Sequence, residues 1–329
     1  MNTEILTTNS PAELAHAIAR AVELLNAGEP VALPTETVYG LAADATRADA
    51  AVKIFEAKLR PFFDPLIVHL PDLEWLERIA VADSPLVAKL IATFWPGPLT
   101  LVFRRRDIVP DIVTSGLATV AVRMSAHPVF RAIATAFGKP LAAPSANPFG
   151  RISPTTAQHV RDGLEGRIPL IVDGGACAVG IESTIVAVEG DRLRILRAGP
   201  VTAEELAPFG EVEFASAGAV PDAPGQLKSH YAPRTPLRWA EHRTSNIEHR
   251  TSKCGLLAFT SPGNADGFAA VEILSLTGDL REAAATLFAK LRRLDDAGLD
   301  LILAEPVPER ALGIAIMDRL RKAAADRAD

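Results

Sequence analysis

Cysteine and aromatic side chains are scarce in this chain and a net positive charge is missing, and each of these features argues against a class of protein. Its 329 residues contain 2 cysteines, Cys177 and Cys254, which cannot make a disulfide framework or a zinc site. Aromatic residues make up 5% of the sequence, and the formal net charge is -6. A general nucleic-acid binder is basic and offers aromatic platforms, so we expect at most a local or transient contact with RNA.

Long apolar runs and the familiar glycine-rich nucleotide loops are missing as well. No stretch reaches the ~18 consecutive apolar residues typical of a membrane helix, and Met1-Asn2-Thr3-Glu4 has no basic leader. We therefore expect a cytoplasmic protein with no membrane partner. Neither G-x-x-x-x-G-K-S/T nor G-x-G-x-x-G follows a strand pattern, so a bound nucleotide would have to be held by scattered residues.

The remaining composition predicts two α/β units joined by a linker. Hydrophobic residues make up 48% of the sequence, which is enough for a sizeable core. Strand and helix patterns alternate over 1–207, which predicts an α/β domain. Gly, Ala, Pro and Ser then dominate much of 208–236, as in a linker, and a smaller α/β unit is predicted over 237–329. A polar near-repeat within 241–252 is interpreted as an exposed insertion.

A polar segment after the first buried strand pattern is a candidate site. Val31-Ala32-Leu33 is a short apolar strand that stops at Pro34, and Thr35-Glu36-Thr37 follows directly. Functional residues gather at strand ends in α/β folds. These three polar residues are therefore candidates for a site.

The next helix pattern places two cations at its end. Phe55 and Leu59 are predicted on its apolar face, with Lys58 and Arg60 in or just after its last turn. Cations at this position are compatible with a solvated helix end favoured by the helix dipole, or with a site for an anion. The polar strand end before them, and His69 at the end of the apolar strand after them, favour the site.

A strand predicted over Thr119–Met124 carries an arginine in an unusual setting. A period of two puts its valines on one face and Thr119, Ala121 and Arg123 on the other. The arrangement fits an arginine that holds a carboxylate or phosphate against the sheet. An edge strand with Arg123 in water fits equally well, and the pattern leaves both interpretations open.

Small polar residues at other strand ends are weaker signals. They let backbone amides approach an anion closely, but they are also common turn formers. The chain offers such positions at Ser145-Ala146-Asn147, Ser153 and Ser183. Another predicted strand ends in a cation, Arg197, and the linker contains Ser229-His230-Tyr231, which is chemically richer than a spacer needs.

Taken in order, these motifs resemble the long form of the threonylcarbamoyl-AMP synthase family, which has a YrdC-like catalytic domain, a linker and a smaller C-terminal domain. The resemblance covers nearly the whole chain. The motifs that carry it are Pro34–Leu41, Lys58-x-Arg60-Pro61, Pro65–His69, Pro144–Asn147, Glu182–Ile185, Ser229–Pro233, Ala304-Glu305-Pro306 and Asp318-Arg319-Leu320. Leu59, Phe62 and Asp64 depart from the family pattern, which usually has Gly, Ser and Asn at these positions.

The resemblance implies a fold and a reaction. The fold would be α/β: a YrdC-like twisted mixed sheet flanked by helices in 1–207, a linker or lid over the active site in 208–236, and a smaller Rossmann-like domain in 237–329. The reaction would be that of a nucleotidyltransferase, giving L-threonylcarbamoyl-AMP and pyrophosphate from L-threonine, bicarbonate and ATP. The product would pass to the tRNA threonylcarbamoyl-transferase machinery, which modifies adenosine next to the anticodon.

The matched positions also imply roles for individual residues. L-Threonine would contact Thr35, His69, Arg123, Ala143 and Ser183. ATP with Mg²⁺ would contact Lys58, Thr119, Ser145, Asn147, Ser153, Arg197 and Tyr231, with Lys58 and Arg60 as the catalytic residues. No metal site made by the protein itself is implied.

Other interpretations stay open at this point. The main alternative is an RNA-binding or ribosome-maturation YrdC-like module, which the negative charge disfavours. A carbamoyl-adenylate-forming enzyme of metallocentre maturation has a related domain but would carry zinc-finger cysteines that this chain lacks. The linker is either a lid that brings Tyr231 to the nucleotide or a flexible tether.

Overall fold

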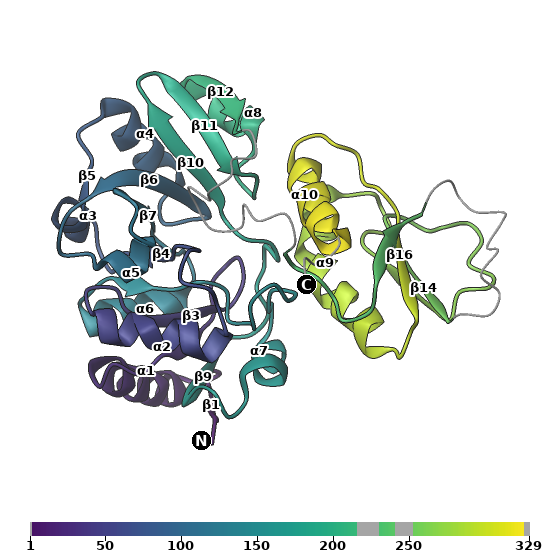
Figure 1. Cartoon of the computed structure of the whole chain (residues 1–329), viewed down its shortest axis with the longest axis horizontal. Coiled ribbons are helices and arrows are strands. Elements are labelled where there is room, and N and C mark those ends of the chain that lie inside the picture. The colour runs from purple at the N-terminus through teal and green to yellow at the C-terminus, as the bar shows by residue number, and fades with distance from the viewer. Residues whose placement is uncertain (1, 216–229, 241–252, 326–329) are drawn as a thin grey trace.

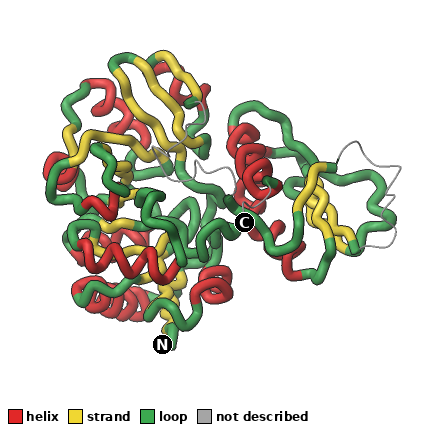
Figure 2. Tube along the Cα trace, in the orientation of Figure 1, coloured by secondary structure: helices red, strands yellow, loops and turns green. Residues whose placement is uncertain are grey.

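The computed structural model describes residues 2–215, 230–240 and 253–325, which form a large and a small unit (Figure 1). Strands run through both units with helices packed around them (Figure 2). The near-repeat of 241–252 lies outside the described residues. Within the described ranges, no helix is both long and apolar enough to cross a bilayer.

A twisted, mixed sheet forms the middle of the large unit and is 12-stranded in the described residues. Neighbouring strands β4 (Ile67–His69) and β7 (Thr119–Arg123) are parallel, whereas β7 and β6 (Leu99–Arg105) are antiparallel, so the predicted α/β fold with a mixed sheet is confirmed. In spatial order the strands are β1 (Glu4–Thr7), β9 (Leu170–Asp173), β2 (Val31–Leu33), β3 (Gly40–Asp44), β8 (Leu141–Ala142), β4 (Ile67–His69), β7 (Thr119–Arg123), β6 (Leu99–Arg105), β10 (Thr184–Glu189), β11 (Arg192–Arg197) and β12 (Glu211–Phe214), with β5 (Ala80–Val81) paired to β6.

Helices flank this sheet, as the alternating pattern predicts. The first begins at the expected cap, since the Ser10 side chain accepts a hydrogen bond from the backbone N–H of Glu13. The helices of the large unit are α1 (Pro11–Asn26), α2 (Ala48–Lys58), α3 (Glu74–Ile79), α4 (Pro85–Phe94), α5 (Asp111–Thr114), α6 (Pro128–Phe137), α7 (Ala157–Leu164) and α8 (Ala203–Leu206), followed by the 3₁₀-helix η1 (Ala207–Phe209).

Strand β7 lies inside the sheet, between β4 and β6. Val120 and Val122 belong to the main hydrophobic core, whereas Ala121 packs in a separate apolar cluster, so the predicted alternation is confirmed. Arg123 ends the strand and is only 3% exposed. The interpretation of β7 as an edge strand with Arg123 in water is therefore wrong.

The small unit has a 4-stranded sheet in the described residues, and its paired strands are parallel. Its strand order is β13 (Leu237–Trp239), β16 (Leu301–Ala304), β14 (Cys254–Ala258) and β15 (Ala270–Ile273), and its helices are α9 (Leu280–Asp296) and α10 (Leu312–Ala324). The two helices lie on the side of this sheet that faces the large unit (Figure 1). They are thus the elements through which the small unit can reach the site.

The range 208–236, predicted as a linker from its composition, begins with further structure of the large unit. Strand β12 pairs in parallel with β11 and extends the first sheet. Composition gave no sign of it because three of its residues are exposed to water and only Val212 packs on the core. Residues 230–236 then join the two units, with Ala232 N–H donating to Gly150 O. The boundaries at 207 and 236 stay predictions.

The end of α2 reverses one expectation, for Leu59, and decides between two open interpretations of Lys58. Leu59, expected on the buried face, is 68% exposed, and Lys58 is 1% exposed. The reason is the backbone: Leu59 caps the helix in the left-handed conformation, with φ of 54° and ψ of 41°. A left-handed residue ends the helical period, so the face predicted from spacing no longer applies to it.

We expect the substitution Leu59→Gly to stabilise the protein, because glycine adopts this conformation without the clash of a Cβ atom. The expected gain is about 1 kcal/mol in the free energy of unfolding, measured from urea midpoints. Leu59→Ala is the matched control: it also removes the exposed side chain but keeps the Cβ, so it should gain little. Equal midpoints for the two variants would contradict the strain argument.

Candidate active site

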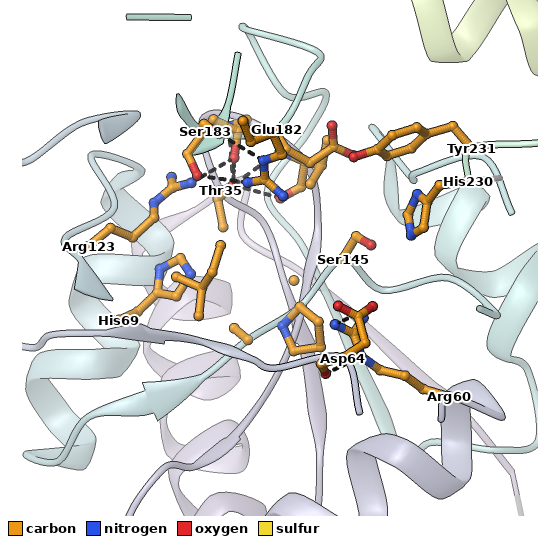
Figure 3. Close-up of a pocket in the computed structure, with 17 residues that line it drawn as sticks. Thr35, Arg60, Asp64, His69, Arg123, Ser145, Glu182, Ser183, His230 and Tyr231 are labelled. Atoms are coloured by element: carbon orange, nitrogen blue, oxygen red, sulfur yellow. Dashed lines mark hydrogen bonds and ion pairs between the residues drawn. The ribbon is translucent and has the colours of Figure 1, made fainter. Parts of the chain in front are cut away.

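One pocket is lined by polar residues at the ends of several strands of the large unit (Figure 3). Its walls come from the turn after β2, the loop between α2 and β4, the ends of β4, β7, β8 and β11, and the segment before β10. The segment that joins the two units adds His230 and Tyr231. The lining residues are Thr35, Thr37, Val38, Gly40, Arg60, Asp64, Ile67, His69, Arg123, Ala143, Pro144, Ser145, Glu182, Ser183, Arg197, His230 and Tyr231.

The residues that the resemblance implies for L-threonine are brought together in this pocket. Thr35, His69, Arg123, Ala143 and Ser183 all line it. In Figure 3, Arg123 and His69 lie on one side of the pocket, and His230 and Tyr231 lie on the other. The pocket therefore has one wall made by β-strand ends and an opposite wall made by the joining segment.

Arg123 is held in place by Glu36, an acidic residue to which the sequence alone assigned no role of its own. Its guanidinium forms an ion pair with Glu36 and donates to Thr37 Oγ1 at 3.2 Å. Glu36 is itself fixed by hydrogen bonds from the Ser125 hydroxyl and the Ala126 N–H. The Nε of Arg123 is buried and has no hydrogen-bond partner among the described residues. The arginine is thus oriented and still has a donor for a ligand.

His69 is buried against Arg123 and packs on Phe130, with 4.9 Å between the ring centroids. Burial removes the ring from water and Arg123 repels a positive charge, and both lower the pKa of His69 well below its ordinary value. The imidazole is therefore neutral near pH 7. Its Nδ1 has no hydrogen-bond partner in the part of the chain that the structure describes, and it can serve a polar ligand.

Three buried cations, Lys58, Arg60 and Arg197, form a cluster at the pocket. Lys58, at the end of α2, donates to the backbone carbonyls of Ser145 and Asn147. Burial, and then repulsion from Arg60, lower its pKa well below the ordinary value. Burial likewise lowers the pKa of Arg60 and of Arg197. The solvated-helix-end interpretation of Lys58 and Arg60 is wrong, because both are buried.

Asp64 is the acidic counterpart of this cluster. Its carboxylate lies 2.8 Å from the Arg60 guanidinium, yet neither oxygen accepts a hydrogen bond from any described residue. Burial raises the pKa of Asp64, against the lowering effect of Arg60, Lys58 and Arg197. In Figure 3 the carboxylate points into the pocket. Buried oxygens without donors are unusual and indicate space for a ligand.

The residues that the resemblance implies for ATP are only partly at the pocket. Ser145, Arg197 and Tyr231 line it. Lys58, Asn147 and Ser153 do not line the pocket but contact residues beside it. The Asn147 amide donates hydrogen bonds to the backbone oxygens of Pro148 and Arg151, and the Ser153 hydroxyl donates one to Glu182. Thr119 does not line the pocket and begins β7, at the end of the strand opposite Arg123.

Tyr231 enters the pocket from the joining segment in a strained conformation. Its φ is 62°, in the left-handed region, and its ring stacks on Phe288 of α9 with 5.6 Å between centroids. Its hydroxyl is buried and finds no hydrogen-bond partner within the described ranges. A strained, buried residue with an unused polar atom points to a functional role.

Several residues of this site were not assigned a role from the sequence. Glu36 sits in the polar run after β2 and Glu182 beside Ser183, so their neighbours gave a signal. His230 had only its place in the linker motif. Burial, and then repulsion from Arg60 and Lys58, lower its pKa well below the ordinary value. Arg319, which reaches Glu182 from α10, had only its place in the Asp318-Arg319-Leu320 motif.

Comparisons with known proteins agree with this geometry. The chain is 40% identical to the threonylcarbamoyl-AMP synthase of Bacillus subtilis over 338 residues, covering 99% of this chain and 96% of the relative. It is also 40% identical to that of Pyrococcus abyssi, covering 93% of this chain and 94% of the relative. The crystal structure of P. abyssi Sua5 complexed with L-threonine matches with a TM-score of 0.89 and 36% identity, covering 98% of both chains.

Two family models match successive parts of the chain. The model described as "Telomere recombination" (Sua5, YciO and YrdC) matches residues 23–199, and the model of the threonylcarbamoyl-AMP synthase C-terminal domain matches residues 201–325. Escherichia coli YciO, with a TM-score of 0.53 and 21% identity, shares the fold of the large unit. The resemblance found in the motifs is therefore confirmed, and the chain belongs to the threonylcarbamoyl-AMP synthase family, in its long form.

Proposed function

We propose that this protein makes L-threonylcarbamoyl-AMP and pyrophosphate from L-threonine, bicarbonate and ATP. The observation that carries the proposal is a single pocket in which a neutral histidine and a held arginine face a buried cationic cluster. Relatives that align with nearly the whole chain are threonylcarbamoyl-AMP synthases. The P. abyssi Sua5 of the matching crystal structure is complexed with L-threonine.

L-Threonine would bind on the wall formed by β4 and β7. Arg123 offers its unpartnered Nε to the carboxylate, and Glu36 keeps the guanidinium from rotating away. His69 and the hydroxyls of Thr35 and Ser183 are close enough to line the same space and would contact the amine or the side-chain hydroxyl.

ATP would lie along the cationic part of the pocket, with its phosphates near Arg60 and Arg197 and beside Ser145. No group of ≥ 3 His, Cys, Asp or Glu side chains suited to a metal occurs in the described ranges, so Mg²⁺ would be held mainly by phosphate oxygens and water. When bound, such an ion supplies charge neutralisation at the leaving pyrophosphate. Lys58 would fix the Ser145 turn from behind rather than touch the phosphates.

The chemistry needs alignment more than a nucleophilic side chain. The amine of threonine attacks the carbon of bicarbonate, and water leaves to give a carbamate. A carbamate oxygen then attacks the α-phosphorus, and the bond to the β-phosphate oxygen breaks. Alignment of such partners can contribute up to ~7–11 kcal/mol. Because a carbamate decomposes in water, the segment with His230 and Tyr231 would act as a lid that excludes solvent.

The product would be used by a tRNA threonylcarbamoyl-transferase in the cytoplasm. Supporting this, a net charge of -6 disfavours stable tRNA binding by this chain itself. The adenylate would therefore leave the enzyme and be captured by the enzyme that binds the tRNA.

Pyrophosphate release should require all three substrates. With ATP, L-threonine and bicarbonate together we expect steady release, and omission of either L-threonine or bicarbonate should reduce it to background. A coupled pyrophosphatase assay in buffer freed of carbon dioxide measures this. Equal release without L-threonine would rule out the proposed function.

Asp64→Asn should tighten ATP binding. The substitution removes a negative charge from the cluster of Arg60, Arg197 and Lys58 while keeping the side-chain shape, so KM for ATP should fall about three- to tenfold. KM for L-threonine should stay within twofold, and Asp49→Asn, an exposed change on α2, is the matched control. Weaker ATP binding in Asp64→Asn would instead show that the carboxylate itself holds the nucleotide or its ion.

Stability without ligands should fall as the pH drops below about 6.5. The pKa values of His69 and His230 are lowered in the folded state, so below 6.5 the unfolded chain binds protons that the folded chain does not. Urea midpoints should be flat from pH 8 to 7 and decrease toward pH 5. His69→Gln should flatten this decrease and the exposed His16→Gln should not. A decrease of equal slope in His69→Gln would contradict the assignment.

A further inference from the structure

Glu182 connects the pocket to the small unit. One carboxylate oxygen accepts a hydrogen bond from the Ser153 hydroxyl at 2.5 Å, and the other accepts one from Arg319 Nε at 3.0 Å. Arg319 belongs to α10, so this ion pair joins the two units of the chain. Glu182 itself lines the pocket and lies beside Tyr231 in Figure 3.

Arg319 makes two further contacts near the pocket in addition to its ion pair with Glu182. Its Nη1 donates a hydrogen bond to the backbone oxygen of Ala198 at 2.7 Å, and Ala198 directly follows Arg197 in the sequence. Its guanidinium carbon lies 5.3 Å from the centre of the Tyr231 ring, within the range of a cation–π contact. Arg319 is 1% exposed, so no water replaces these partners.

The Arg319 guanidinium is positively charged in this contact. Burial lowers the pKa of Arg319, but Tyr231, Glu182 and Asp318 raise it, and the net direction is upward. The guanidinium thus stays positive at any pH at which the protein is folded. Without it, the Glu182 carboxylate would lose its ion-pair partner in a pocket that, under the proposed function, has to accept a polyphosphate.

We propose that Arg319 is a positioning residue for the adenylation step, through which the small unit completes the nucleotide side of the pocket. It neutralises Glu182, keeps that carboxylate turned toward Ser153, and holds the Tyr231 ring in place. This inference rests on the proposed function, since it assumes that the cationic half receives ATP. It assigns a role to the C-terminal domain that the large unit alone cannot supply.

The test compares substitutions on one helix. Arg319→Met removes the charge but keeps much of the volume, and Arg319→Lys retains the charge without the planar fork. Arg321→Met is the matched control, because Arg321 is about half exposed on α10 and pairs with Glu309 away from the pocket. Arg319→Gln, which keeps a donor for Glu182, replaces the methionine variant if that variant does not fold.

For Arg319→Met we expect KM for ATP to rise at least tenfold, with KM for L-threonine within twofold of wild type. Arg319→Lys should recover part of the loss, and Arg321→Met should match wild type. Adding Glu182→Gln to Arg319→Met should recover ATP binding, because the uncompensated carboxylate is then gone. No merely structural role of Arg319 predicts this recovery.

Two results would overturn the proposal. One is an ATP KM within twofold of wild type in a folded Arg319→Met or Arg319→Gln variant. The other is a further loss, rather than a recovery, when Glu182→Gln is added. ATP binding by calorimetry is measured alongside turnover, so a wild-type protein that binds ATP but releases no pyrophosphate with L-threonine and bicarbonate would count against the proposed function and not against Arg319.

Discussion

Buried cations need oxygen partners, and this constraint shapes the whole pocket. A guanidinium or ammonium group removed from water is costly unless oxygens surround it. Lys58 is surrounded by carbonyls of the turn after β8, and Arg123 by Glu36 and Thr37. The cations therefore hold the loops in place as much as the loops hold the cations. Among the described residues of the lining, only Asp64 and Glu182 supply negative charge, which leaves room for an anionic ligand.

The same constraint links the two units of the chain. Glu182 has its ion-pair partner, Arg319, in the other unit, and Arg319 also pairs with Asp318 on its own helix. The joining segment adds apolar contact, since Tyr231 stacks on Phe288 of α9. An enzyme that handles a water-sensitive carbamate needs a closed site, and a second unit bound across the pocket can supply one.

Local patterns in the sequence were sufficient where neighbours in the chain decide the structure. The cap at Ser10, the alternation along β7 and the polar turn after β2 all follow from spacing. Local patterns were insufficient where contacts with residues far along the chain decide the structure. Strand β12 exists because it pairs with β11, although its own residues are mostly exposed. Lys58 is buried because carbonyls from a loop far along the chain reach it.

The central claim is that one pocket joins threonine, a carbamate carbon and the α-phosphate of ATP. Mass spectrometry of the nucleotide product formed from ¹³C-bicarbonate tests it most directly. The account predicts an adenylate of L-threonylcarbamate whose mass rises by one unit with the labelled bicarbonate. An adenylate of threonine without the label, or AMP as the first product in a rapidly quenched reaction, would contradict it.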